Sequence, residues 1–322
     1  MVFIKPFTNG DLVHVRMLWE KKALTTPWLF RPISYELLDE QVFGNVLFDR
    51  QGFLLAFEGD RPVGMIHASF LPDNDWSGPS NIHGIIVAPI VAPDAEDPET
   101  IEKELIIAAE NYLKEKGIKV WCAGGCEKLS PFYTGLYGNG IPYGFFENDQ
   151  KTIDLFEKMG YHFHMKFKRF SLDSQEYCPP TTIRIRESRQ RFEVFMNKPS
   201  LTRNWWEANV YRNFQTFEWN AFLKDHSSLD PIGGALLHQM YTAGRNVQCI
   251  LSDIGVSEAY LRLGLGSILL TTLIHDIANM LYSAVHINIA VFERDERFIS
   301  FLKRHGFKPI NGQISLYKTS EN

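Results

Sequence analysis

The chain has 322 residues, of which 45% are hydrophobic and 22% are charged, and its formal net charge is −5. This composition is typical of a globular protein long enough to form two compact cores. The negative charge balance disfavours sequence-independent nucleic-acid binding, which needs a basic face. Met1–Pro6 contains no long apolar run, and the most apolar stretch, 263–274, is too short to span a bilayer. We therefore expect a cytoplasmic protein with no signal peptide, no nucleic-acid partner and no membrane partner.

The chain has four cysteines, which are too few for a disulfide framework at this length: Cys122, Cys126, Cys178 and Cys249. Cys122 and Cys126 stand close together, but no second pair accompanies them. We therefore expect no metal site. None of these features predicts the oligomeric state.

The first half of the chain contains a series of strand and helix patterns. We expect strands at 52–57, 62–70 and 81–89, a helix at 98–116, a strand at 119–123 and a helix at 149–159. The third strand ends in Val-x-Pro at Val87–Pro89, and the last helix stops at Gly160. The loop that follows Pro89 has no glycine and carries three carboxylates, which would repel a phosphate group.

Two features of the first half have more than one interpretation. The insertion Ser130–Phe146 is rich in aromatic residues and glycine. It either lines an acceptor pocket, packs two halves of the protein together, or covers an exposed sheet edge. His83 lies on a predicted strand and is interpreted as a structural or substrate-binding histidine.

The second half begins after the polar, proline-containing stretch Ser174–Pro180. Strict alternation over Thr181–Arg186 predicts that a strand opens it. Trp205, Trp206 and Trp219 are expected to pack in the core or between domains. Further along, we expect strands at 218–224 and 231–240, a strand ending at 256, a helix starting near 265, a strand at 284–291 and a helix at 295–305.

The most informative segment is Val256–Ser267, where a strand end, a loop with Gly264 and Gly266, and an amphipathic helix follow one another. Glycine lets the backbone come close to a ligand, and the free N–H groups in the first turn of a helix favour anions. The segment lacks the third glycine of the dinucleotide fingerprint and the Gly-Lys-Ser/Thr of the P-loop. It therefore predicts a phosphate site of another kind; the alternative is a helix start with small residues for packing.

This segment resembles the signature of the GCN5-related N-acetyltransferase (GNAT) family, in which a strand ending Val-x-Pro precedes Gln/Arg-x-x-Gly-x-Gly/Ala at a helix start. The matching residues are Val256, Gly264 and Gly266. Glu258 stands where proline is usual, and Leu261 stands at the Gln/Arg position, with Arg262 one residue later. In the family, the backbone N–H groups of this loop bind the pyrophosphate of acetyl-coenzyme A (acetyl-CoA).

The resemblance extends along the whole chain as a repeat. Asp149 precedes Gly160 by eleven residues, and Asp295, which is placed to cap its helix, precedes Gly306 by the same number. The resemblance implies an α/β (α+β) fold class with two tandem GNAT-type folds, each a mixed, mostly antiparallel twisted sheet flanked by helices.

The implied domains are residues 1–175, with a degenerate coenzyme loop, and residues 181–322, with the acetyl-CoA site. The residues expected to bind this cosubstrate are Ile254, Val256, Leu261, Arg262, Leu263, Gly264, Leu265, Gly266, Ser267 and Asp295. The implied activity is transfer of an acetyl group from acetyl-CoA to an amine of a small molecule or peptide, in the C-terminal domain. Ser252 and Asp253 are the candidate catalytic residues, because Ser252 shares a strand face with the valine and a bulge near Gly255 would turn Asp253 toward it.

Two alternative functions are left open by the sequence. The family's usual catalytic tyrosine corresponds to Leu302 in the second half and Phe156 in the first, and neither side chain donates a proton. The chain could therefore be a catalytically inactive acyl-CoA-binding sensor or scaffold. The third interpretation is a tandem-GNAT aminoacyl transferase that uses charged tRNA, which the net negative charge disfavours.

Overall fold

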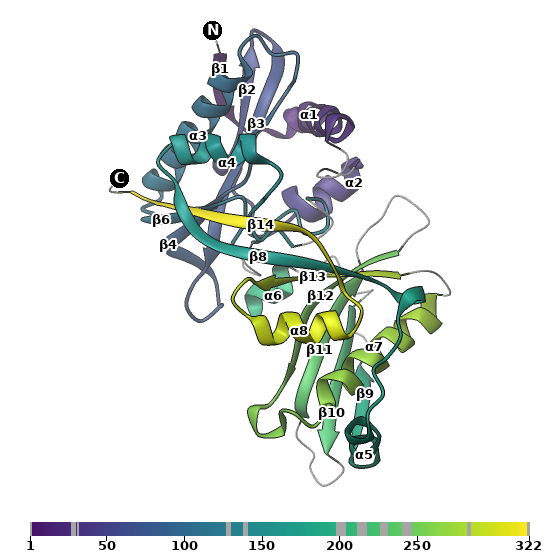
Figure 1. Ribbon diagram of the computed structural model, residues 1–322. Helices are drawn as coiled ribbons and strands as arrows, with labels where there is room; N and C mark the ends of the chain where they lie inside the picture. Colours follow the sequence, from purple (N-terminus) through teal and green to yellow (C-terminus); the bar gives the residue numbers. More distant parts are fainter. Residues whose placement is uncertain are drawn as a thin grey trace. The chain divides into compact units, whose positions relative to one another are not determined.

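A computed structural model describes residues 2–26, 30, 32–126, 130–137, 141–197, 204–210, 218–225, 231–239, 247–281 and 285–320 (Figure 1). The chain forms two compact units. Unit 1 comprises Met1–Phe167, Arg203–Asn213 and Asn311–Asn322, and unit 2 comprises Lys168–Thr202 and Phe214–Ile310. The division into residues 1–175 and 181–322 stays a prediction about the repeat, because the compact units assign three segments differently: 168–175, 203–213 and 311–322.

Unit 1 is built on a mixed sheet with the strand order β1-β2-β3-β4-β6-β14. Its strands are β1 (Val2–Pro6), β2 (Phe53–Glu58), β3 (Arg61–Pro72), β4 (Pro79–Ile86), β6 (Val120–Ala123) and the end of β14 (Lys308–Thr319). Neighbouring strands are antiparallel except β4 and β6, which are parallel. Short strands β5 (Ile90–Val91) and β7 (Phe145–Phe146) pair with β3 and β14. β8 (His162–Asp173) continues from unit 1 into unit 2.

The helices of unit 1 are α1 (Leu12–Thr25), α2 (Tyr35–Leu38), α3 (Pro98–Glu115), α4 (Gln150–Lys158) and α6 (Trp205–Val210). Figure 1 shows α1 and α3 on opposite sides of the β2–β3 pair. α3 begins where Asp97 accepts a hydrogen bond from the Thr100 N–H at 3.2 Å. Its apolar face packs on the sheet in a core that includes Ile101, Leu105, Ala109, Leu113, Ile66, Ile86 and Trp121.

A buried ion pair fixes the C-terminal strand in unit 1. Lys318 of β14 donates to the Glu110 carboxylate of α3 at 3.0 and 3.1 Å and to the Met159 carbonyl at 2.8 Å. Lys318 is 8% exposed and Glu110 is 4% exposed. Because a buried charge without a partner is costly, this pair ties the strand to the helix.

Unit 2 has the strand order β13-β12-β11-β10-β9. Its strands are β9 (Phe192–Asn197), β10 (Glu218–Asp225), β11 (Pro231–Gln239), β12 (Val247–Val256) and β13 (Val285–Phe292). Its helices are α5 (Ile183–Arg191), α7 (Leu265–Leu281) and α8 (Glu296–Arg304). As in unit 1, one neighbouring pair, β12 and β13, is parallel and the others are antiparallel. Every fourth residue of α7 is buried in the core: Leu265, Leu269, Leu273 and Ile277.

The predicted order of strands and helices is confirmed with one exception. Residues 181–186, predicted as a strand, instead lead into helix α5. Thr182 is extended, and its Oγ1 accepts a hydrogen bond from the Ile185 N–H at 3.2 Å, which is a helix cap that the alternating pattern conceals. Met240 and Ala284, at the ends of two predicted strands, lie outside the described residues. Single turns of 3₁₀ or π helix lie at Asn9–Asp11, Asp39–Phe43, Arg50–Gly52, Ser174–Glu176 and Glu258–Tyr260.

Strands β12 and β13 separate before either of them ends. Their parallel pairing covers only Val247–Ile250 against Val285–Asn288. β12 then continues to Val256 without pairing to β13, and a bulge at Ser252 bends it, because the two neighbours of Ser252 pair with consecutive residues of β11. In unit 1 the equivalent parallel strands stay paired to the last residue of β4, Ile86.

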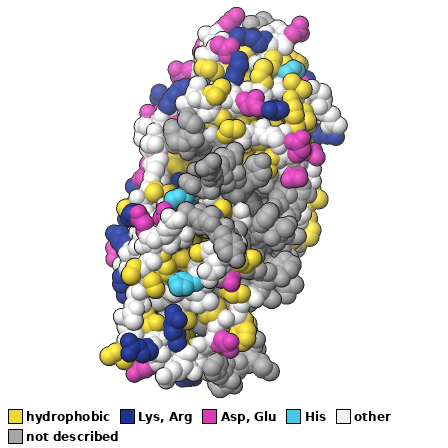
Figure 2. Space-filling view, turned by 90° about the vertical axis from the view of Figure 1, so that its right-hand side faces the viewer, with side chains coloured by type: hydrophobic (Ala, Val, Ile, Leu, Met, Phe, Trp, Pro, Cys, Tyr) yellow, Lys and Arg dark blue, Asp and Glu magenta, His cyan; other side chains and the backbone are white. Residues whose placement is uncertain are grey.

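Two properties of the described ranges bear on membranes and nucleic acids: the helices and the charges on one face. None of the helices in those ranges is long and apolar enough to cross a bilayer. On the face that Figure 2 shows, basic and acidic side chains of the described residues are interspersed, with hydrophobic ones between them. Mixing of this kind creates no extended positive field on that face.

Candidate functional site

The loop between β12 and α7 in unit 2 presents a row of unused hydrogen-bond donors. The backbone N–H groups of Arg262–Gly266 donate to no acceptor among the described residues. Helical bonding starts with Ser267 and Ile268, whose N–H groups both donate to the Gly264 carbonyl, at 3.1 and 3.2 Å. A run of free donors at the N-terminus of a helix favours an anion such as phosphate.

Two side chains of helix α5 donate hydrogen bonds to carbonyl groups of this loop. Arg184 donates from Nη1 to the Arg262 carbonyl at 2.8 Å. Ser188 donates from Oγ to the Leu263 carbonyl, also at 2.8 Å. Because the side chains of α5 bind only the carbonyl groups of the loop, the N–H groups of the loop stay available to a ligand.

Two residues of the loop have a left-handed backbone conformation. Arg262 has φ of +65° and Gly264 has φ of +80°. The left-handed region costs a residue other than glycine about 1–2 kcal/mol, and strain of this kind collects at functional sites. Gly264 is required for a second reason, because a Cβ there would lie 2.8 Å from Cγ1 of Ile185 in α5.

The loop borders a cavity of about 700 Å³ that lies within unit 2. This volume is typical of small-molecule sites. The charged side chains that line it are strongly unbalanced: Arg184, Arg262, Arg297 and Arg304 against one carboxylate, Asp295. The cavity therefore favours a ligand that carries several negative charges.

Helix α8 contributes one of its faces to the cavity. Asp295 caps the helix as predicted, because its Oδ1 accepts a hydrogen bond from the Phe298 N–H at 2.9 Å, and Gly306 ends it with φ of +81°. The rings of Phe298 and Phe301 stack with their centroids 5.8 Å apart. Both rings line the cavity together with the two arginines of this helix, and so offer a flat apolar surface beside positive charge.

His305 connects the cavity to the interior of unit 2. The ring is 1% exposed, with Nε2 2.9 Å from Ser267 Oγ and Nδ1 3.0 Å from the Tyr177 hydroxyl. That hydroxyl lies 2.8 Å from Thr271 Oγ1. Burial, and secondly the charge of Arg304, lowers the pKa of His305 to about 4, so the imidazole is neutral near pH 7. The ring thereby fixes the Ser267 hydroxyl in the first turn of α7.

Comparisons with known proteins agree with this geometry. Residues 182–307 match the model of the acetyltransferase (GNAT) family.

We use the term GNAT domain for this matched segment, residues 182–307.

Solved structures extend the fold of this GNAT domain to the whole chain. A tandem GNAT protein from the clavulanic acid biosynthesis pathway is similar with a TM-score of 0.69 at 13% identity, covering 99% of this chain and 98% of that one. A GCN5-related N-acetyltransferase from Sphaerobacter thermophilus gives 0.62 at 11% identity, covering 99% and 95%. The glucosamine N-acetyltransferase region of a fungal multi-domain GH3 β-N-acetylglucosaminidase gives 0.71 at 16% identity, covering 99% of this chain and 38% of that one. A comparison with curated protein sequences found no match.

The predicted fold is therefore confirmed: a tandem GNAT fold in which mixed, mostly antiparallel sheets are flanked by helices. At these sequence identities the structural matches establish the fold alone. The GNAT fold implies acyl transfer from an acyl-CoA to an amine.

The GNAT domain places nine of the ten predicted coenzyme-binding residues at the cavity: Ile254, Val256, Leu261, Arg262, Gly264, Leu265, Gly266, Ser267 and Asp295. The tenth, Leu263, does not line the cavity, although its N–H belongs to the row of free donors. The role of these residues in coenzyme binding stays a prediction.

The two predicted catalytic residues lie away from the cavity lining. Ser252 is buried, and its Oγ donates to the Leu236 carbonyl of β11 at 3.2 Å. The predicted bulge exists, but it lies at Ser252 and not near Gly255, so the alternation of faces along β12 changes at the serine itself. Asp253 follows it on β12 and is half-buried. The catalytic roles of Ser252 and Asp253 stay predictions that this geometry does not support.

The positions of the family's usual tyrosine are core positions in both units. Leu302 is 0% exposed in the unit 2 core, and Phe156 is 0% exposed in the unit 1 core. Leu302 does not line the cavity of unit 2 and Phe156 does not line that of unit 1, and neither side chain carries a proton to donate.

Sequence reasoning missed several cavity residues. Arg297, Phe301 and Arg304 lie four and three positions apart on α8 and thus on one helix face, a spacing that could have been recognised. Arg184 gave no such signal, because its segment was predicted as a strand. His305 could not be distinguished by pattern from a helix-end histidine on the surface.

In unit 1 the segment equivalent to the coenzyme loop forms hydrogen bonds with the sheet. Val91 pairs with Gly64 and Ile90 with Met65, as β5 lies against β3, and the Ala92 N–H donates to a β3 carbonyl at 2.8 Å. Backbone groups engaged in this way are not free for a phosphate. This arrangement supports the prediction that the first coenzyme loop is degenerate.

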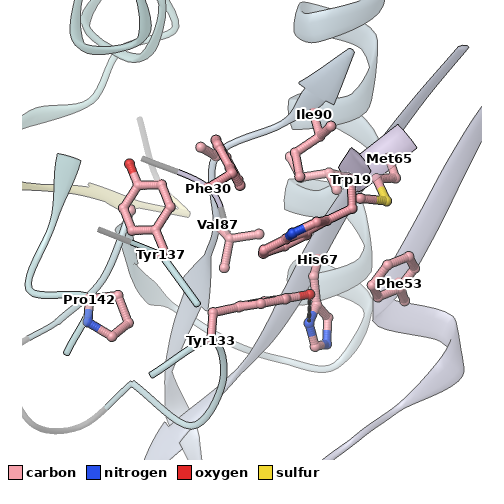
Figure 3. Close-up of a pocket in the computed structure, with 13 residues that line it drawn as sticks. Trp19, Phe30, Phe53, Met65, His67, Val87, Ile90, Tyr133, Tyr137 and Pro142 are labelled. Carbon is pink, nitrogen blue, oxygen red and sulfur yellow. Dashed lines mark hydrogen bonds between the residues drawn. The ribbon is translucent and has the colours of Figure 1, made fainter. Parts of the chain in front are cut away.

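A smaller cavity, of about 40 Å³, lies within unit 1 (Figure 3). Figure 3 shows Tyr133 beside Trp19, with its hydroxyl bonded to His67, 3.1 Å from Nδ1. Burial lowers the pKa of His67 to about 3, so the ring is neutral. The cavity is far smaller than a typical small-molecule site.

The roles that the sequence left open for the aromatic insertion stay predictions. Tyr133, Tyr137 and Pro142 line the small cavity of unit 1, while Phe145–Phe146 form β7 alongside β14. Residues 138–140 of the insertion lie outside the described residues. His83 is exposed, and its role stays a prediction.

Proposed function

We propose that the GNAT domain transfers an acetyl group from acetyl-CoA to an amine of a small molecule or a peptide. The observation that carries the proposal is the row of free N–H donors at Arg262–Gly266, which opens onto a cavity lined by four arginines and one carboxylate. Coenzyme A carries a pyrophosphate and a ribose phosphate, so it matches both the donors and the positive charge.

Each part of the cavity suits a different part of such a cosubstrate. The loop and the first turn of α7 are placed to bind the pyrophosphate. Arg297 and Arg304 provide charge for a further phosphate, and the stacked rings of Phe298 and Phe301 provide a surface for a planar base.

The separated strands provide a place for the reacting group. Ile254, Gly255 and Val256 of β12 line the cavity beyond the point where β12 stops pairing with β13. Among the described strands, backbone groups on the β13 side of that segment have no partner, so they can bind the amide groups of an extended chain. A strand N–H aimed at a thioester carbonyl would stabilise the negative charge that develops when an amine attacks it.

The proton steps have to proceed without a tyrosine. The acceptor amine must lose a proton to become a nucleophile, and His305 is a poor base, because both of its ring nitrogens contact hydroxyl groups. We infer that water carries this proton out of the cavity. The leaving thiol needs no acid, because a thiol with a pKa of about 8.5 departs as a thiolate far more easily than an alcohol would.

The second candidate function is an acyl-CoA sensor or scaffold without turnover. The burial of Leu302 and Phe156 favours it, because neither unit offers the family's usual acid. Both candidates require the coenzyme to bind, and they differ only in whether an acetyl group is transferred.

The test combines calorimetry with a transfer assay on the full chain. We expect acetyl-CoA to bind one site per chain, and Arg304→Gln to weaken it about 10-fold or more through the loss of one charge-assisted contact of about 1.5–3 kcal/mol. Arg50→Gln, which removes an exposed arginine of unit 1, is the matched control and should bind normally. Thiol release across a panel of amines then identifies an enzyme. Binding without release identifies a sensor, and no binding at all contradicts both.

A further inference from the structure

A cluster of two thiols and an imidazole lies in unit 1, and none of its three residues lines either cavity. Cys122 in β6, Cys126 just beyond that strand and His164 in β8 bring their ligand atoms within 4.8 Å of one another. His164 lies far along the chain from the two cysteines, which is why the sequence did not indicate the cluster.

The backbone between the two cysteines is shaped to bring them together. Gly124 and Gly125 have φ of +78° and +143°. A Cβ at Gly125 would lie 2.0 Å from the Pro142 carbonyl oxygen, so no other residue fits there. The Cys126 N–H donates to Ser130 Oγ at 3.0 Å, which holds the second cysteine in place.

The surroundings of the cluster are apolar on one side and open on the other. Cys122 and Cys126 are 6% and 7% exposed and pack with Leu71 and Ile85. His164 is exposed, so solvent reaches the cluster at the imidazole.

We propose that Cys122, Cys126 and His164 bind a zinc ion. Tetrahedral zinc with bonds of about 2.3 Å to sulfur and 2.0 Å to nitrogen needs ligand atoms about 3.5–3.8 Å apart, so a contraction of about 1 Å would complete the site. The Cys-x-x-x-Cys spacing falls within the range of zinc sites. Two thiolates balance the charge of Zn²⁺ in the apolar surroundings, and the fourth position is open to water.

The bound ion has a structural consequence for unit 1. It would join β6 and the residues just beyond it to β8, which lies far along the chain. The candidate coenzyme cavity lies in unit 2 and none of the three residues lines it, so the zinc site is independent of acetyl transfer.

The test measures metal directly on the full chain. The reduced protein, stripped with a chelator and then dialysed, is titrated with Zn²⁺ and with Co²⁺, whose thiolate complexes absorb in the near ultraviolet. We expect one equivalent of either metal, a cobalt–thiolate absorption band, and a melting temperature that Zn²⁺ raises by several degrees. Cys126→Ser and His164→Ala should each reduce zinc affinity at least 10-fold.

Matched controls separate a specific site from general thiol chemistry. Cys249→Ser removes another buried cysteine and Cys178→Ser an exposed one, and both should bind zinc as the unaltered protein does. His162→Ala removes a second exposed histidine of β8, which like His164 lies against the Tyr317 ring, and should also leave binding unchanged. His164 is exposed, so its variant should fold. The proposal is overturned if the reduced protein gives no cobalt–thiolate band, if Cys122 and Cys126 only form a disulfide, or if His164→Ala binds zinc normally.

Discussion

Replacing Gly264 by alanine tests the loop on which the coenzyme site depends. Two effects reduce stability. The residue has φ of +80°, where a side chain costs about 1–2 kcal/mol. The new Cβ would also lie 2.8 Å from Cγ1 of Ile185, and overpacking of this kind costs about 1–3 kcal/mol. After an opposing gain of about 0.4–1 kcal/mol from the less flexible unfolded chain, we expect a net loss of about 2–3 kcal/mol.

Gly117→Ala is the matched control for this variant. Gly117 has the same φ of +80°, but a Cβ there would meet nothing within 4 Å. It therefore carries the backbone strain without the packing conflict, and we expect a loss of about 1 kcal/mol or less. Urea unfolding of the two variants should differ by the packing contribution of Ile185 alone.

The coenzyme affinity provides the decisive measurement. If Ile185 or the loop moves to accept the new methyl group, the N–H groups of Arg262–Gly266 no longer converge, and the loss of one charge-assisted hydrogen bond lowers affinity about 10- to 100-fold. Calorimetric titration with coenzyme A measures this in both variants. The reasoning is refuted if Gly264→Ala binds within twofold of the unaltered protein, or if Gly117→Ala weakens binding equally.

Three further predictions concern strain, pH and the C-terminal strand. Arg262→Gly should raise the free energy of unfolding by about 0.5–1 kcal/mol, because it relieves φ of +65°, yet weaken coenzyme binding; urea unfolding that shows a loss would contradict it. The pKa of His305 is lower in the folded protein than in the unfolded chain, so between pH 6.5 and 4 only the unfolded chain binds a proton at this residue. The free energy of unfolding should therefore fall as the pH is lowered through this range and stay level above pH 6.5. At about 1.4 kcal/mol per pKa unit this loss is at most about 3 kcal/mol, reduced by solvent screening, and thermal melts of His305→Gln should show a weaker pH dependence. Lys318→Met should cost about 3–5 kcal/mol in urea unfolding, because it leaves Glu110 buried without its cation, and Glu110→Gln in the same chain should restore part of that loss; a single variant within 1 kcal/mol would count against the pair.

The sequence was sufficient for the elements whose patterns are local. The periodicity of α7, the cap at Asp295 and the left-handed glycine at Gly306 depend only on neighbouring residues, and all three are present in the structure. The same holds for Gly264 and Gly266, whose place between a strand and a helix predicted a loop with free N–H donors.

Tertiary structure alone decided the features that depend on residues far apart in the chain. Thr181–Arg186 alternates like a strand, yet a cap at Thr182 and the acceptor carbonyl at Arg262 make it the start of a helix that supports the loop. The residues at 311–322 belong to unit 1 because Lys318 finds its partner in α3. Strand pairing, burial and charge compensation act between segments that no local sequence pattern relates. The sequence therefore determined the two folds and the loop, whereas only packing determined which side chains surround the loop.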